Sequence, residues 1–167
     1  MKKFHVYAKA AFSVLALGAM LTFSSCKDEC KDVTCNNGGT CVTGSCECTT
    51  GYEGTNCETE TRAKFIGTYT TNGSVTCPVS GNGTLTGTSI SITNSSSAAN
   101  KIVISVLGVN LTATVSGSSF TLDQSTQNNF TYTGNGSLSG TTITINLNEQ
   151  DPSIGETCVY TVTGPKQ

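Results

Sequence analysis

Residues 141–148 read TTITINLN, so that Ile143, Ile145 and Leu147 alternate with hydroxyl- or amide-bearing side chains. Residues 111–115, LTATV, repeat the same alternation. An apolar face and a polar face that exchange at every residue are typical of half-buried antiparallel strands. These two stretches therefore predict an antiparallel β domain.

The same kind of pattern continues from Phe65 to the end of the chain. The apolar run from Ile102 to Leu107 predicts a strand covered on both faces. Asn-Gly pairs favour two-residue hairpin turns, and they occur at Asn72-Gly73, Asn82-Gly83 and Asn135-Gly136. About eight to ten short strands with tight turns must close into a barrel or pack as a sandwich. We assign residues 65–167 to a small antiparallel β-barrel, with an immunoglobulin-like β-sandwich as the alternative.

The charge of the chain argues against nucleic acid as a partner. The formal net charge is −2, but Lys2, Lys3 and Lys9 all lie in the first nine residues. From Cys26 onward the chain has six basic and eleven acidic residues, an excess that repels phosphate backbones. The only histidine is His5, so the rest of the chain has no imidazole for catalysis or metal binding.

The N-terminus has the pattern of an export signal. Its basic start is followed by an uncharged, mostly apolar run from Ala10 to Phe23. This run is shorter than the roughly 18 residues that a membrane-spanning helix needs. It therefore predicts a secretory signal peptide over residues 1–25, and a retained N-terminal anchor helix is the alternative.

Residues 21–26, LTFSSC, resemble the box of bacterial lipoproteins, although Phe23 departs from the aliphatic residue usual at its position. The resemblance implies cleavage before Cys26, lipidation of Cys26 and a short lipidated tether over residues 26–29. Lys27-Asp28-Glu29 resembles a signal that sends some Gram-negative lipoproteins to the cell surface. The implied location is the outer membrane, lipid-anchored and surface-exposed; a solvated charged linker is the other interpretation.

The cysteine count supports export. The chain has nine cysteines, an odd number that needs an explanation in an exported protein. They are Cys26, Cys30, Cys35, Cys41, Cys46, Cys48, Cys57, Cys77 and Cys158. If Cys26 is lipidated, the six cysteines clustered from Cys30 to Cys57 and the remaining Cys77 and Cys158 can all form disulfide pairs, as expected in an oxidising compartment.

Residues 46–57, CECTTGYEGTNC, resemble the EGF signature C-x-C-x-x-G-Y-x-G-x-x-C, and residues 36–41 are similar to the turn before its third cysteine. An EGF-like domain is implied over residues 30–57, with a truncated central hairpin. Spacing alone leaves the disulfide connectivity open. The resemblance implies the pairs Cys30–Cys41, Cys35–Cys46 and Cys48–Cys57. A domain this small needs such bridges because it cannot bury a sufficient core.

Metal sites are not expected. A zinc cluster would need thiolates, which a reducing compartment maintains. Calcium prefers many oxygen ligands, and although Asp28 and Glu29 precede the first cysteine of the cluster, residues 42–45 add no carboxylate. We therefore predict neither a metal nor a cofactor.

The start of the C-terminal domain adds a second resemblance. After a polar linker over residues 58–64, the segment 65–69, FIGTY, resembles the aromatic-x-Gly-x-aromatic start of lipocalin-like barrels. This implies an up-and-down barrel. A disulfide between Cys77 and Cys158 would tie the last strand to the first hairpin and would stabilise the closed barrel by constraining the unfolded chain.

No catalytic residues are predicted. The acids of the C-terminal domain are Asp123, Glu149, Asp151 and Glu156. A glycosidase needs two carboxyl groups facing one another across a cleft, whereas three of these acids flank Pro152 and Gly155, as in an exposed loop. We expect a protein that is not an enzyme; a hydrolase that uses Glu149 or Asp151 is the alternative.

The leading functional hypothesis is a non-catalytic surface lipoprotein that serves as a binding or adhesion module, with the EGF-like unit as a spacer. The other is a lipocalin-like carrier of a small apolar ligand. Side chains often fill the interior of a small barrel, so the carrier hypothesis depends on whether five residues leave a cavity: Phe120, Leu122, Phe130, Tyr132 and Tyr160. The expected partners are the membrane and a glycan, a protein or a small apolar molecule.

Overall fold

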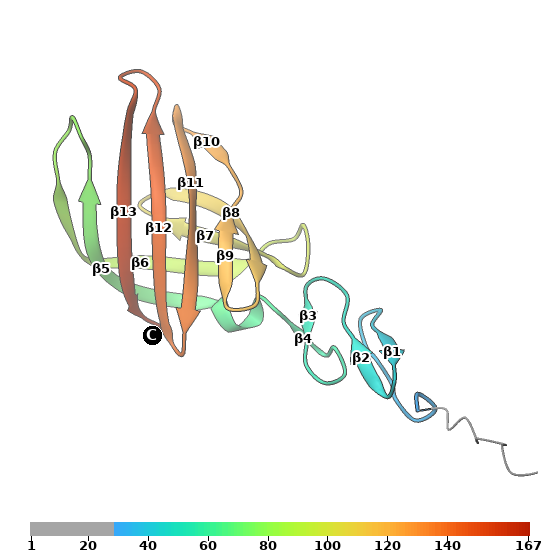
Figure 1. Cartoon of the computed structure of the whole chain (residues 1–167). Coiled ribbons are helices and arrows are strands. Elements are labelled where there is room, and N and C mark those ends of the chain that lie inside the picture. The colour runs from blue at the N-terminus through green and yellow to red at the C-terminus, as the bar shows by residue number, and fades with distance from the viewer. Residues whose placement is uncertain (1–28) are drawn as a thin grey trace, which may run out of the picture.

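A computed structural model describes residues 29–167 of the chain. The predicted signal peptide, Cys26 and the tether as far as Asp28 lie outside the described residues. Figure 1 shows a small N-terminal module leading into a larger β domain.

The small module is held by disulfides and two short hairpins. Its elements are β1 (Thr40–Val42), β2 (Ser45–Glu47), β3 (Tyr52–Glu53) and β4 (Thr59–Glu60), followed by the 3-10 helix η2 (Ala63–Phe65). β1 pairs with β2 and β3 with β4, both antiparallel. The disulfides are Cys30–Cys41, Cys35–Cys46 and Cys48–Cys57, the same pairs that the EGF resemblance implies.

The larger domain is a closed antiparallel barrel. Its strands are β5 (Gly67–Thr76), β6 (Gly83–Asn94), β7 (Lys101–Val106), β8 (Val109–Ser116), β9 (Ser119–Leu122), β10 (Ser125–Gln127), β11 (Phe130–Ser139), β12 (Thr142–Asp151) and β13 (Glu156–Pro165). Each strand from β5 to β9 pairs with the next, as do the three from β11 to β13, and β13 returns to β5. A short pairing of β9 with β11 completes the circuit, while β10 extends the sheet beside β11. The fold class predicted from the sequence is confirmed as an all-β barrel, and the sandwich alternative is wrong.

The alternation that predicted strands places the core. Ile143, Ile145 and Leu147 of β12 are buried and their neighbours are not. One end of the barrel is filled by aromatic side chains. Phe65 of η2 meets Phe120 edge to face, with ring centroids 5.7 Å apart. The Tyr69 hydroxyl, also buried, donates a hydrogen bond to the Phe65 carbonyl oxygen at 2.8 Å.

None of the three Asn-Gly pairs forms the predicted two-residue hairpin turn. Asn72-Gly73 lies within β5 and Asn135-Gly136 within β11, and only Asn82-Gly83 falls at the entrance to a strand. A β-carbon at Gly73 would overlap the Thr161 carbonyl of β13, and one at Gly136 would overlap the Phe120 ring. These glycines therefore serve close approach of neighbouring groups inside the barrel wall rather than turn formation.

The run from Ile102 to Leu107 also differs from expectation. β7 ends at Val106, and only Ile102 and Ile104 are buried. Leu107 leaves the strand and forms the two-residue turn before β8, together with Gly108. The strand is half-buried because its outer face meets solvent rather than a second layer.

The fourth disulfide, Cys77–Cys158, links the segment after β5 to β13 across 81 residues of sequence. Since β13 pairs with β5, the bond joins the first and last strands of the barrel at their seam.

Candidate binding site

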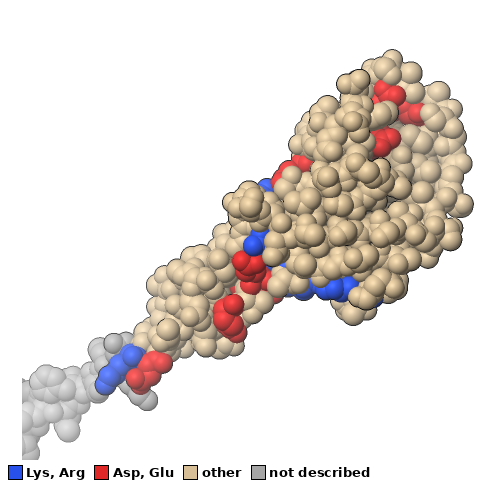
Figure 2. Space-filling view, turned by 180° about the vertical axis from the view of Figure 1, so that it is seen from behind, with Lys and Arg blue, Asp and Glu red and all other residues tan. Residues whose placement is uncertain are grey.

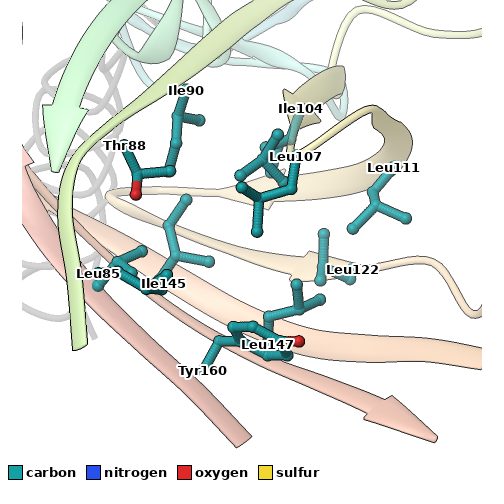
Figure 3. A pocket seen from close by; sticks show the side chains of 12 residues that line it. Leu85, Thr88, Ile90, Ile104, Leu107, Leu111, Leu122, Ile145, Leu147 and Tyr160 are labelled. Atoms are coloured by element: carbon teal, nitrogen blue, oxygen red, sulfur yellow. The ribbon is translucent and has the colours of Figure 1, made fainter. Parts of the chain in front are cut away.

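The barrel end opposite the aromatic side chains contains an apolar cavity between β6 and β7 on one side and β12 and β13 on the other (Figure 3). Its lining is Leu85, Thr88, Ile90, Ile104, Val106, Leu107, Leu111, Leu122, Ile145, Leu147, Tyr160 and Val162. Nearly all of these side chains are aliphatic. Such a lining favours hydrocarbon groups over polar ones.

The cavity is small. The space that the centre of a water molecule can reach is about 30 Å³, enough for roughly two waters. Sites for small-molecule ligands usually measure about 300–1,000 Å³. Of the residues on which the carrier hypothesis depends, Phe120, Leu122 and Tyr132 are buried and Phe130 and Tyr160 are half-buried. In this conformation they fill most of the interior.

Two tyrosines lie beside a carboxylate near this end. The Tyr160 hydroxyl donates to Glu149 Oε1 at 3.3 Å. Burial, together with the charge and hydrogen bond of Glu149, raises the pKa of Tyr132 to about 12. Burial and Glu149 also raise the pKa of Tyr160. Because both phenols stay protonated at neutral pH, they act there as hydrogen-bond donors beside a negative charge.

Glu156 organises the loop between β5 and β6. One carboxylate oxygen accepts hydrogen bonds from the backbone amides of Val79, at 2.6 Å, and Ser80, at 2.7 Å. The other accepts a bond from the Ser80 hydroxyl at 2.5 Å. The bonds from Ser80 lower the pKa of Glu156 most. This carboxylate is therefore a structural cap for the loop.

The remaining two acids are also engaged locally. Asp151 accepts hydrogen bonds from the hydroxyl and the amide of Ser153, which lower its pKa. Burial raises the pKa of Asp123, but hydrogen bonds from Lys101 and Thr114 outweigh it and leave the pKa below its usual value. The structure thus brings Glu149, Asp151 and Glu156 to one end of the barrel and leaves Asp123 apart.

One group of potential metal ligands lies in the described part of the chain: Cys77, Glu156 and Cys158. Both cysteines are joined in a disulfide. Metals bind the thiolate form of cysteine, so this cluster in its oxidised form is not a metal site.

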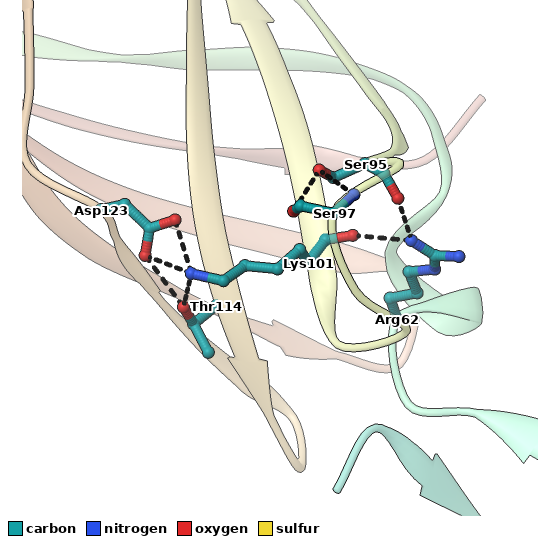
Figure 4. A network of polar contacts seen from close by, with 6 residues as sticks. All are labelled: Arg62, Ser95, Ser97, Lys101, Thr114 and Asp123. Atoms are coloured by element: carbon teal, nitrogen blue, oxygen red, sulfur yellow. Dashed lines mark hydrogen bonds and ion pairs between the residues drawn. The ribbon is translucent and has the colours of Figure 1, made fainter.

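The sequence reasoning missed Arg62, which lies in the segment expected to be only a linker. Its guanidinium donates to three carbonyl oxygens: Ser95 at 2.5 Å and Ala98 at 2.9 Å in the loop between β6 and β7, and Lys101 at 3.1 Å at the start of β7. Figure 4 shows the bonds to Ser95 and Lys101. Glu60 binds the same guanidinium through both of its oxygens. Arg62 is 9% exposed, so this connection between the module and the barrel is nearly dry.

Other contacts strengthen this junction. Lys64 forms an ion pair with Glu53 at 2.9 Å, and the Thr61 amide donates to the Gly51 carbonyl at 2.9 Å. A β-carbon at Gly51 would lie only 3.0 Å from Ala99 of the loop between β6 and β7. The backbones therefore touch there, and glycine allows the approach.

The junction sets the direction of the barrel. The β12–β13 hairpin lies at the end of the barrel away from the small module (Figure 1). Figure 2 shows acidic groups around a hollow at the far end of the molecule and basic groups near the junction and one side of the barrel. The open end thus points away from residue 29.

The comparisons with known proteins show similarity of fold. No family model and no curated protein matches the chain. A crystal structure of a "putative outer membrane protein" from Bacteroides fragilis NCTC 9343 has 18% sequence identity and a TM-score of 0.50. The match covers 64% of this chain and 52% of that one, so the similarity spans about half the neighbour's length. A Bacteroides ovatus protein of unknown function matches at 9% identity, with a TM-score of 0.47, over 60% of this chain and 41% of that one.

Among the described residues, no helix has both the length and the apolar character needed to cross a membrane.

Proposed function

We propose that this protein is a non-catalytic lipoprotein of the outer membrane that carries a barrel-shaped binding or adhesion module on the cell surface. Lipid on Cys26 anchors it, and the EGF-like unit serves as the spacer. The name of the structural neighbour from Bacteroides fragilis supports the proposed location.

The observation that carries the proposal is the Arg62 junction. A carrier that only encloses a ligand has no need for a fixed orientation, whereas a surface adhesin needs its binding face turned outward. Three backbone carbonyl oxygens and Glu60 hold Arg62, and charge-assisted hydrogen bonds are among the strong ones in proteins. The disulfides below the junction keep the spacer short and stiff.

The experiment uses cells that produce the full chain. Labelling with an alkyne fatty acid should mark the protein, and Cys26→Ala should remove the label. External protease should digest the protein on intact cells, and those cells should bind to immobilised host glycans or matrix proteins more than cells lacking the chain do. An unlabelled protein, or one protected from protease, contradicts the anchor or the display; equal binding by cells without the chain contradicts adhesion.

The aliphatic cavity favours a second candidate, a carrier of a small apolar ligand. Its volume of about 30 Å³ requires that the barrel widen before a ligand enters. Native mass spectrometry of the purified protein tests this: a retained apolar molecule supports it, and a ligand-free mass without uptake of an apolar dye argues against it.

A further inference from the structure

One edge of β6 lacks a strand partner along most of its length. β6 pairs with β5 from Gly83 to Ile92, but its pairing with β7 extends only from Ser91 to Asn94. On the β7 side, residues 83–90 therefore have no strand partner within residues 29–167. An unpaired edge of this kind presents backbone donors and acceptors to another chain.

This edge has few of the features that usually protect such strands. Residues 83–90 read GTLTGTSI, without a charge or a proline, and natural proteins commonly place lysine or proline on exposed edges. The one irregularity is a bulge at Gly87, whose φ is +64° and whose amide donates to Asn72 Oδ1 at 2.9 Å. The bulge divides the edge into two short runs, residues 83–85 and 88–90.

The apolar cavity opens beside this edge. Leu85, Thr88 and Ile90 of β6 form one wall, and the turn between β7 and β8 supplies Leu107 on the other (Figure 3). Leu107 is 62% exposed and has a φ of +48°. Leucine rarely adopts this left-handed conformation, and asparagine does so more readily. The stability of the turn therefore does not explain why an exposed leucine stands at this position.

The charge at this end of the barrel is negative. Glu156 bonds to Ser80, three residues before Gly83, and Glu149 and Asp151 lie at the same end of the barrel. The two lysines of the barrel are elsewhere: Lys101 pairs with Asp123, and the Lys166 ammonium lies 3.5 Å from the Lys64 carbonyl oxygen. A basic partner therefore complements this end of the barrel.

We propose that the free edge of β6 binds an extended, basic segment of a partner protein by strand addition. The segment pairs its backbone with residues 83–85 and 88–90. Alternate apolar side chains of the segment turn toward Leu85 and Leu107, and its lysines or arginines lie near the carboxylates. Backbone pairing gives such complexes affinity, while alternate side-chain pockets give specificity. This inference rests on the proposed binding function and names the chemistry of the partner.

The test uses the purified protein and a peptide of alternating lysine and valine, about seven residues long, which matches the length of the edge. Titration calorimetry measures binding, and hydrogen exchange measures protection of the backbone amides. We expect saturable binding with new protection in residues 83–90. A glutamate-valine peptide should bind at least about tenfold more weakly because its charges repel the carboxylates. N-methylation along one edge of the lysine peptide should abolish the protection.

Leu107→Asn is the informative variant, because asparagine suits the positive φ and should keep the barrel folded. It should weaken peptide binding about fivefold or more by removing an apolar contact. Val42→Asn, at a half-exposed valine of the small module, is the matched control and should leave binding unchanged.

Three results would overturn the proposal. The first is that the lysine peptide does not bind, and the second is that it binds without protecting the amides of residues 83–90. The third is that these amides become protected as the protein concentration rises in the absence of peptide. That result would identify a second copy of the chain as the occupant of the edge. If cells still adhere while the peptide fails, the proposed function stands and only this inference falls. If the cells do not adhere and the peptide does not bind, both the proposed function and this inference are wrong.

Discussion

Removal of the Cys77–Cys158 disulfide should lower the free energy of unfolding of the barrel by about 4.5 kcal/mol. The bond closes a loop between residues 81 apart in sequence, and the chain-entropy relation for a loop of that length gives this value at 25 °C. Replacement of both cysteines by alanine leaves the pairing of β13 with β5 in place. The loss therefore arises mainly from the greater freedom of the unfolded chain.

The predicted loss is large compared with the stability of ordinary domains, which is about 5–15 kcal/mol. For a barrel of about 100 residues the entropy of unfolding near the melting temperature is roughly 0.2 kcal/mol/K, so the melting temperature should fall by about 20 °C. Alanine is preferred to serine because Cys158 is 8% exposed, and serine would bury a hydroxyl there.

Urea unfolding followed by far-ultraviolet circular dichroism measures the effect on the β-sheet signal. The matched control replaces Cys35 and Cys46, whose disulfide spans only 11 residues in the small module. That change should cost the module about 3 kcal/mol and leave the barrel transition in place. A loss below about 1 kcal/mol for the Cys77–Cys158 pair, or an equal loss of barrel stability in the control, would refute the loop-entropy reasoning.

Three further changes test the junction and the open end. Arg62→Ala should lower the free energy of unfolding by about 2 kcal/mol, because it removes charge-assisted hydrogen bonds. It should also make the small module and the barrel tumble separately, as measured by ¹⁵N relaxation, and unchanged tumbling would contradict the rigid junction. Tyr132→Phe should remove a phenolate transition near pH 12 from the ultraviolet titration. Because the pKa of Tyr132 is raised in the folded protein, its contribution to the free energy of unfolding is complete below the ordinary tyrosine pKa of about 10 and is lost as the pH rises toward 12. Glu156→Gln should speed hydrogen exchange at the amides of Val79 and Ser80. Since the pKa of Glu156 is lowered in the fold, its contribution to stability is present above the ordinary carboxyl pKa and is lost as acid protonates the carboxylate. Exchange that responds neither to the substitution nor to acid would contradict the role of Glu156 as a cap.

Local patterns predicted much of the fold. The alternation around Ile143, Ile145 and Leu147 identified a strand and its buried face correctly, because side-chain direction in a strand changes at every residue whatever the partner strand is. The prediction of hairpin turns from Asn-Gly pairs failed at Asn72-Gly73 and Asn135-Gly136, which lie within strands. A glycine needed for a turn and one needed beneath a neighbouring side chain or backbone look alike in a sequence, since only the neighbour distinguishes them.

The candidate site was predicted less completely. The cysteine pattern and its EGF resemblance implied the pairs found in the small module. The acids around Pro152 were expected in an exposed loop, and this was wrong: Glu149 and Asp151 lie in β12, and Glu156 begins β13 and is buried. Arg62 gave no signal, because its three carbonyl partners lie more than 30 residues away and are backbone atoms that any residue carries.

The sequence by itself determined that the chain forms antiparallel strands and which faces of those strands are apolar, because these depend on neighbours along the chain. Only the tertiary structure decided that the barrel closes through β9 and β11, that its interior is nearly full and that β6 keeps a free edge. Those properties depend on register and on the volumes of side chains brought together from distant strands, and neither is encoded in any local segment.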